Sequence, residues 1–142
     1  IEPMISKKYE LIIGSKKDPI FGHVIIFGFG GISVEVFKDI NMGLLPVDMA
    51  KAKKLIEETK ISMLLKGYRG QKGVDMVELE FTLCKFSQLI TDFPEISEID
   101  INPFSIDETG GIVIDAKIIL DKEVLNKKLI DEYTLLLAKH KK

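Results

Sequence analysis

Glu98-Ile99-Asp100-Ile101-Asn102-Pro103 is the stretch from which both the fold and a candidate site can be predicted. Its apolar and polar residues alternate as in a half-buried β-strand, so the two isoleucines are predicted to face one side and the three polar residues, Glu98, Asp100 and Asn102, the other. Pro103 has no N–H group to donate to a sheet, and we expect it to end the strand pairing. Three oxygen-bearing side chains on one face suit a hard cation, because Mg²⁺ takes oxygen ligands and combines one or two carboxylates with phosphate and water.

A second extended segment is predicted over residues 112–118, with its even-numbered apolar residues on one face and Asp115 on the other. Residues 107–111 lie between the two segments and contain two consecutive glycines, which can take positive φ in a turn. Folded as a hairpin, the segments bring Asp115 near Asp100 and Asn102. The pattern alone leaves two interpretations open: an acidic, amide-containing metal platform, or the solvated outer face of an antiparallel sheet.

Length and composition narrow the class of protein. The 142 residues suffice for one domain with its own core, or for one part of a larger protein. The 20 basic and 22 acidic residues give a net charge of -2, and no basic run is interleaved with aromatics, so no nucleic-acid partner is predicted. The apolar runs are far too short to span a bilayer and nothing points to secretion, so no membrane association is predicted and we expect a cytoplasmic protein. The single cysteine, Cys84, excludes an internal disulfide and lies in an apolar stripe, which favours a buried thiol.

The remaining elements are predicted from periodicity and capping residues. Further strands are expected at residues 9–14, 24–27 and 32–37, and helices at residues 49–59, 75–92 and 121–142. Asp48 is the expected N-cap of the first helix, Asp75 is expected to begin the second, and residues 40–48 are expected to be irregular. The last helix carries an apolar stripe that could pack on this domain or on a partner. These elements predict an α+β fold, a mostly antiparallel sheet with packed helices plus a C-terminal helix.

The segment Gly28-Phe29-Gly30-Gly31 is a second candidate site. Three glycines in four residues can expose backbone N–H groups and so form a concavity that holds an anion such as phosphate. A tight hairpin that needs positive φ explains the same cluster equally well.

Seven motifs in order resemble one family. They are Glu10-Leu11-Ile12-Ile13-Gly14, Asp18-Pro19-Ile20-Phe21-Gly22, Phe27-Gly28-Phe29-Gly30-Gly31-Ile32, Gly67-Tyr68-Arg69-Gly70, Asp92-Phe93-Pro94-Glu95-Ile96, Glu98-Ile99-Asp100-Ile101-Asn102-Pro103 and Asp115-Ala116-Lys117-Ile118. Together they resemble the carboxyl-terminal half of the ATP-grasp domain of nucleoside-diphosphate-forming acyl-CoA synthetases. The β subunit of ADP-forming acetyl-CoA synthetase, a relative of succinyl-CoA synthetase, is the most similar member. The resemblance covers about residues 1 to 120, and we expect residues 121–142 to be a helical extension.

The resemblance implies a reaction and its cofactors. Such enzymes interconvert acyl-CoA, phosphate and ADP with free acid, CoA and ATP, and a phosphohistidine carries the phosphoryl group between two sites. Mg²⁺ and ATP or ADP are therefore the expected cofactors. The resemblance further implies that Asn102 and Asp115 are the Mg²⁺ ligands, with Asp100 beside them in the nucleotide site.

The resemblance also assigns nucleotide-facing residues. Glu2 and Met4 match the hinge that lines the adenine pocket, and the loop with Gly28, Gly30, Gly31 and Glu35 matches the segment that faces the phosphates. No catalytic residue is predicted. His23 stands where the family usually has proline and is not expected to be the phosphorylated histidine, and Gly43 replaces a common arginine.

The chain begins at the hinge, so the resemblance implies that partner chains supply the amino-terminal ATP-grasp half and the CoA-binding subunit. We therefore expect a hetero-oligomer in which this chain is inactive alone. Two alternatives stay open from the sequence: a non-catalytic regulatory or assembly module with the same fold, and an α+β domain whose acidic strand only faces water.

Overall fold

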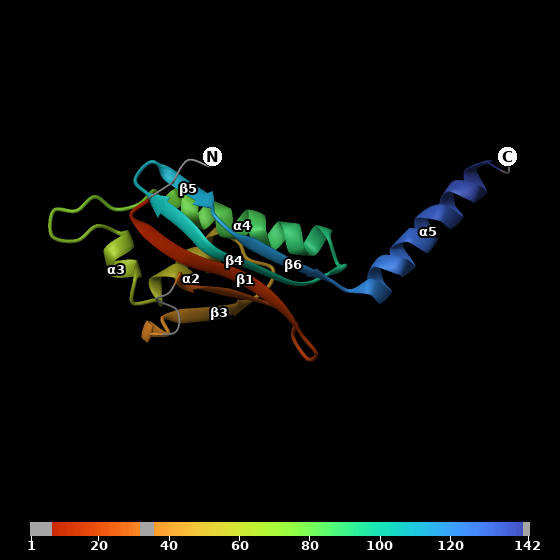
Figure 1. Ribbon diagram of the computed structural model, residues 1–142, viewed down its shortest axis with the longest axis horizontal. Helices are drawn as coiled ribbons and strands as arrows, with labels where there is room; N and C mark the ends of the chain where they lie inside the picture. Colours follow the sequence, from red (N-terminus) through yellow and green to blue (C-terminus); the bar gives the residue numbers. More distant parts are fainter. Residues whose placement is uncertain (1–6, 32–35, 141–142) are drawn as a thin grey trace.

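A computed structural model describes residues 7–31 and 36–140. Its main element is a six-stranded antiparallel sheet in the order β3-β2-β1-β4-β5, with β6 also paired to β4 (Figure 1). The strands are β1 (Tyr9–Asp18), β2 (Gly22–Phe29), β3 (Ile40–Leu44), β4 (Ile96–Asp107), β5 (Gly110–Val113) and β6 (Ala116–Leu120). The helices are α2 (Met49–Glu57), α3 (Ser62–Leu65), α4 (Met76–Asp92) and α5 (Lys122–His140).

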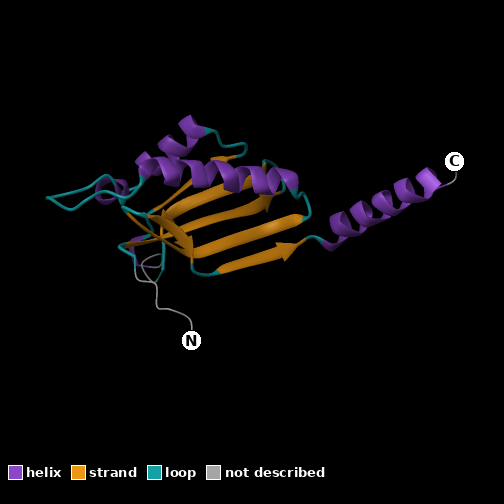
Figure 2. Ribbon diagram, turned by 90° about the horizontal axis from the view of Figure 1, so that it is seen from above, coloured by secondary structure: helices purple, strands orange, loops and turns teal. Residues whose placement is uncertain are grey.

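Helices α2 and α4 lie on one face of the sheet, and the opposite face is free of the described helices (Figure 2). The core lies between the sheet and these two helices. It includes Leu11 and Ile13 of β1, Ile25 and Phe27 of β2, Ile99, Phe104 and Ile106 of β4, Ala52 and Ile56 of α2, and Leu79, Leu83 and Ile90 of α4. The α+β class with a mostly antiparallel sheet, packed helices and a C-terminal helix, predicted from the sequence, is confirmed.

Helices α2 and α4 begin at the predicted positions, and both have an aspartate as N-cap. The Asp48 carboxylate accepts a hydrogen bond from Lys51 N at 2.8 Å at the start of α2, and the Asp75 carboxylate accepts one from Glu78 N at 3.0 Å at the start of α4. A side-chain acceptor at this position satisfies one of the first helical N–H groups, which have no acceptor within the helix. α4 ends before Pro94, as predicted. Cys84 of α4 is partly buried, and desolvation raises the pKa of its thiol, so the neutral form is favoured.

The third strand was wrongly predicted. It is β3, at Ile40–Leu44, in the segment expected to be irregular, whereas Val36 and Phe37 of the predicted strand are helical and residues 32–35 lie outside the described part. β3 pairs with β2, and Met42 is opposite Ile26. Its apolar residues are exposed, because they face the helix-free side of the sheet, so the segment lacks the inward-facing pattern by which a strand is recognised.

Pro103 does not end the strand, contrary to the prediction from its missing N–H group. β4 continues to Asp107, and the register between β1 and β4 shifts between Leu11 and Ile13, which pair with Phe104 and Ile101. The extra residue in β4 at this point is accommodated as a bulge-like irregularity, a common place for proline in a sheet.

Helix α5 projects away from the sheet (Figure 1). None of its residues is fully buried: Val124 and Leu125 in its first turn are partly buried, and the apolar stripe from Leu129 onward is exposed. The start of the helix is attached at Glu95: Lys128 Nζ lies 3.1 Å from Glu95 Oε1, and Asp121 N donates to Glu95 O at 2.7 Å. Within the described part of the chain, no helix combines the length and the apolar character that a membrane crossing needs.

Candidate functional site

The β4–β5–β6 hairpin places Asp115 opposite Asn102. β4 pairs with β5 through Phe104↔Val113 and with β6 through Ile101↔Ala116, and these pairs belong to one continuous register. Asp115 falls in the two-residue gap between β5 and β6, where its carbonyl oxygen still accepts a hydrogen bond from Asn102 N at 3.1 Å. The single strand predicted over residues 112–118 is therefore divided into β5 and β6. Both pair with β4, which is the predicted partner.

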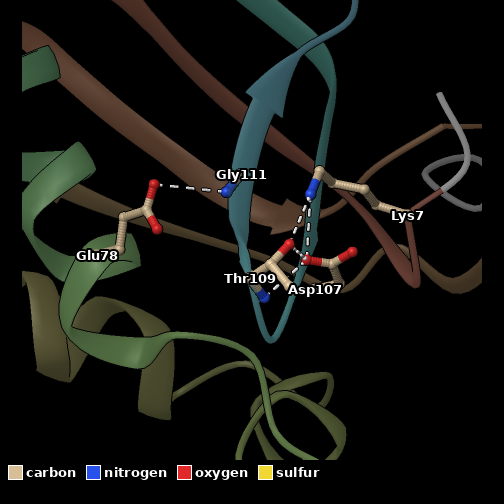
Figure 3. A network of polar contacts seen from close by, with 5 residues as sticks. All are labelled: Lys7, Glu78, Asp107, Thr109 and Gly111. Carbon is tan, nitrogen blue, oxygen red and sulfur yellow. Dashed lines mark hydrogen bonds and ion pairs between the residues drawn. The ribbon is translucent and has the colours of Figure 1, made fainter.

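The register is fixed at the β4–β5 turn, which is tied to two other parts of the chain (Figure 3). Asp107 Oδ1 accepts from the Thr109 hydroxyl at 2.6 Å, from Thr109 N at 2.9 Å and from Lys7 Nζ at 3.1 Å. These hydrogen bonds, led by the Thr109 hydroxyl, lower the pKa of Asp107 to about 2. On the other side, Gly111 N points at the Glu78 carboxylate of α4, at 3.5 Å. A slip of one residue would break these contacts and move Asp115 away from Asn102.

Asn102 and Asp100 lie on the helix-free face, as the alternation predicted. Ile99 on the other face is buried against the helices, whereas Asp100 and Asn102 are partly exposed. Asp100 is opposite Gly14 of β1 and Lys117 of β6, and the missing side chain of Gly14 leaves room beside the Asp100 carboxylate. The sheet thus presents the Asn102 amide and the Asp100 carboxylate on an open face, and the backbone of Asp115 pairs with Asn102 beside them.

The glycine segment lies against the same part of the sheet. Asn102 Oδ1 accepts a hydrogen bond from Gly31 N at 2.7 Å, a contact between residues 71 positions apart. The preceding N–H groups also have protein acceptors: Phe29 N donates to Asp39 O at 3.0 Å and Gly30 N to Glu10 O at 2.8 Å. The structure therefore brings the two candidate sites of the sequence together, and it shows the cluster closely packed on β1 and on Asp39.

Gly28 and Gly30 are needed for this close packing. A Cβ atom on Gly28 would collide with the backbone of Asp39, and one on Gly30 with the backbone of Leu11. Asp39 is a buried residue of this neighbourhood to which the sequence analysis assigned no role. Its carboxylate accepts from Lys60 N at 2.8 Å and from Ile61 N at 2.7 Å. A single aspartate between a predicted strand and a segment predicted to be irregular carries no periodic signal, so only its place in a family motif could have indicated it.

The open face also has an apolar part and a hollow. A cavity of about 340 Å³ lies beside the β1–β2 turn, lined by Lys16, Lys17, Asp18, Pro19, Val24, Ile26 and Met42. Lys16 is opposite Glu98, one strand repeat along β4 from Asp100. A basic side chain and an apolar floor on the acidic face suit an elongated ligand that is anionic in one part and apolar in another.

The donor set can be tested against a cation. Within residues 7–31 and 36–140, no three His, Cys, Asp or Glu side chains gather into a protein-only metal site. An amide oxygen, one opposing carboxylate and a nearby second carboxylate are too few to complete the coordination of Mg²⁺. They fit a Mg²⁺ ion that keeps phosphate oxygens or water as its other ligands.

Some predicted residues cannot be placed. Glu2, Met4 and Glu35 lie outside the described residues, so their roles stay predictions. His23 contacts Ser15, with Nδ1 3.2 Å from Ser15 Oγ, and burial followed by the charge of Lys17 lowers the pKa of His23. Gly43 has only ordinary contacts around its missing side chain, so this position is not forced to be glycine by packing.

Comparison with known proteins gives consistent similarities. A sequence profile described as an ATP-grasp domain matches residues 1–120. The β subunit of acetate–CoA ligase (ADP-forming) II of Pyrococcus furiosus is 41% identical over 123 residues, which are 84% of this chain and 52% of that protein. The 4-hydroxybutyrate–CoA ligase (ADP-forming) of Nitrosopumilus maritimus is 46% identical over 110 residues, 78% of this chain and 16% of that protein.

A solved structure shares the fold. Dinucleotide-forming acetyl-coenzyme A synthetase 1 of Ca. Korarchaeum cryptofilum, in complex with coenzyme A and Mg-AMPPCP, superposes with a TM-score of 0.78 at 37% identity. The match covers 82% of this chain and 55% of that one. The chain thus spans about half the length of the β-subunit relative and less than a fifth of the longer ligase.

Proposed function

This chain belongs to the ATP-grasp domain family, and on that premise we propose that it is the Mg·ATP/ADP-binding part of an ADP-forming acyl-CoA synthetase. The proposed enzyme interconverts acyl-CoA, phosphate and ADP with free acid, CoA and ATP through a phosphohistidine. The observation that carries the proposal is the placement of Asp115 opposite Asn102 on the open face of the sheet, with Asp100 beside them. Relatives named as acetate–CoA and 4-hydroxybutyrate–CoA ligases support the reaction class, and the Mg-AMPPCP complex of a solved relative supports the cofactors.

In this proposal Asn102 and Asp115 would hold the cation, and Asp100 would add a second carboxylate beside them. When bound, Mg²⁺ neutralises charge on the terminal phosphates and orients them for transfer. The chain's own residues position the nucleotide: the open apolar face around Ile26 and Met42 supports it, and the acidic strand fixes the metal end. Glu2, Met4, Glu35 and the cluster of Gly28, Gly30 and Gly31 keep their proposed places along the nucleotide.

We further propose that the amino-terminal half of the ATP-grasp domain and a CoA-binding subunit come from partner chains in a cytoplasmic hetero-oligomer. The sheet face that carries Asn102 is open in the described chain, so a second half could close over it and exclude water (Figure 2). Such enclosure would favour phosphoryl transfer, because the electrostatic interactions that stabilise its transition state strengthen when water is excluded.

The test is turnover after reconstitution. The chain is combined with a chain that carries the amino-terminal ATP-grasp half and with a CoA-binding subunit, and ATP formation from acetyl-CoA, phosphate and ADP is measured. We expect turnover with the wild-type chain, loss of turnover in the Asn102→Ala, Asp115→Ala double variant, and retention in the control Lys53→Ala, which changes an exposed residue of α2 on the other side of the sheet. Mg·ATP binding without any turnover would favour the regulatory alternative and contradict the enzymatic proposal.

A further inference from the structure

We infer that the backbone N–H of Gly31 is a positioning group that orients the side chain of Asn102 toward the cation. The inference rests on the proposed function and adds to it a residue that contacts the metal ligand and not the metal. Gly31 N lies 2.7 Å from Asn102 Oδ1, and the contact is partly buried. This hydrogen bond links the end of β2 to the middle of β4, across β1.

The bond decides which end of the amide faces the cation. The oxygen and the NH₂ group of an asparagine side chain have nearly the same size, and a half-turn about the last side-chain bond exchanges them. Only the oxygen can bind a cation. Gly31 N–H can only donate, so it forms a hydrogen bond with the amide oxygen and not with the NH₂ group. The flipped amide is therefore disfavoured. Because a carbonyl oxygen has two lone pairs, Asn102 Oδ1 keeps one for the metal while the other is held by Gly31.

The donor itself is held firmly. Gly31 has a φ of +65°, in the left-handed region where glycine is favoured. The preceding Gly30 N donates to Glu10 O at 2.8 Å, and the Glu10 carboxylate fills the space that a Gly31 side chain would need. The direction of the Gly31 N–H is therefore set by the backbone of β1. The same bond means that this N–H is already used, so Gly31 contributes to the site through Asn102 and not by binding phosphate directly.

The inference predicts a loss of metal affinity from a residue that touches no metal. Groups that orient a metal ligand are typically worth about 10–100-fold in affinity. In Gly31→Ala the Glu10 carboxylate, the end of a flexible side chain, has to move aside, and the new side chain strains a backbone at a φ of +65°. Relaxation of that strain turns the Gly31 N–H away from Asn102. Gly70→Ala is the matched control, because Gly70 has a φ of +76° and nothing lies within 4 Å of its missing side chain. It therefore imposes the same backbone strain away from Asn102.

The test uses Mn²⁺ with ADP as the probe, and free Mn²⁺ is counted by electron paramagnetic resonance in titrations of the full chain. We expect binding about tenfold or more weaker for Gly31→Ala, and a change of less than about twofold for Gly70→Ala. Equal affinity of wild type and Gly31→Ala would overturn the inference and leave the proposed function intact. Absence of Mn²⁺·ADP binding by the wild type, both alone and with the amino-terminal ATP-grasp half, would overturn both.

A second measurement needs neither metal nor a strained variant. Amide hydrogen exchange of Gly31, followed by NMR, should be slow in the wild type and in Asn102→Asp, which keeps an acceptor oxygen. It should be at least about fivefold faster in Asn102→Ala, because a lost hydrogen bond removes protection. Exchange that is unchanged in Asn102→Ala would show that Gly31 does not donate to Asn102, and the inference would fail even if Gly31→Ala did not fold.

Discussion

Replacing Asp39 by alanine should destabilise the domain strongly, although the residue lies outside every strand and helix described. The side chain is only 8% exposed. Its carboxylate accepts from Lys60 N and Ile61 N, at 2.8 and 2.7 Å, and its carbonyl oxygen accepts from Phe29 N at 3.0 Å. Asp39 thus connects the segment before α3 to the end of the strand that carries the glycine cluster.

The magnitude follows from the two side-chain bonds. Each hydrogen bond to a charged acceptor contributes about 1.5–3 kcal/mol, so the pair contributes about 3–6 kcal/mol. Part of this is offset because the alanine variant no longer desolvates a carboxylate. We expect a decrease of about 3 kcal/mol in the free energy of unfolding, which for a chain of this size lowers Tm by about 10 °C.

Thermal and urea unfolding followed by circular dichroism measure these changes. Asp18→Ala is the matched control, because the Asp18 carboxylate also accepts two backbone N–H groups, from Ile20 at 2.8 Å and Phe21 at 2.9 Å, but at an exposed hairpin turn. Water can replace that acceptor, so the Tm of Asp18→Ala should fall much less. Equal decreases in Tm for the two variants, or a decrease of less than about 1 kcal/mol in the free energy of unfolding of Asp39→Ala, would show that burial does not strengthen the contribution of the Asp39 carboxylate.

Three further predictions concern other parts of the fold. The pKa of Asp107 is lowered from 3.8 to about 2, so its carboxylate stabilises the fold above pH 4 and this contribution is lost as the pH falls toward 2. Asp107→Asn should therefore flatten the acid limb of the Tm-versus-pH curve, and a limb parallel to that of the wild type would contradict the assignment. Lys128→Ala releases the base of α5 from Glu95, so chymotrypsin should cut α5 faster while the sheet's Tm is unchanged; an unchanged cleavage rate would show that the ion pair does not hold the helix. Leu83→Ala removes a fully buried side chain of α4 and should cost about 3 kcal/mol in urea unfolding, a value that a result under about 1 kcal/mol would contradict.

Local patterns were sufficient to predict the acidic hairpin. The alternation around Asp100 and Asn102 gave the correct faces, because one side of β4 is buried by helices and the other is open. The glycine-containing turn then fixed the pairing, and with it the position of Asp115 opposite Asn102. The helix starts at Asp48 and Asp75 could also be predicted from the sequence, because each depends on a hydrogen bond between residues three positions apart.

Features that depend on distant contacts were not predictable from these patterns. β3 has its apolar side chains on the open face, so its pattern does not resemble that of a strand with a buried face. The continuation of β4 beyond Pro103 depends on pairing with β1 and β5. The contact between Gly31 and Asn102 joins residues 71 positions apart, and no periodicity encodes it. The exposure of α5 could not be predicted from its apolar stripe either, because such a stripe is expected of a helix that packs on its own chain as well as of one that packs on a partner.

The most direct test of the central claim is calorimetric titration of Mg·ATP into the chain, alone and with the amino-terminal ATP-grasp half. We predict heat of binding that disappears when Mg²⁺ is chelated and that is lost in the Asn102→Ala, Asp115→Ala double variant while the variant stays folded. Binding of the same strength in the double variant, or no Mg²⁺-dependent binding by the wild type in either setting, would contradict the claim that these two side chains hold a nucleotide-bound cation.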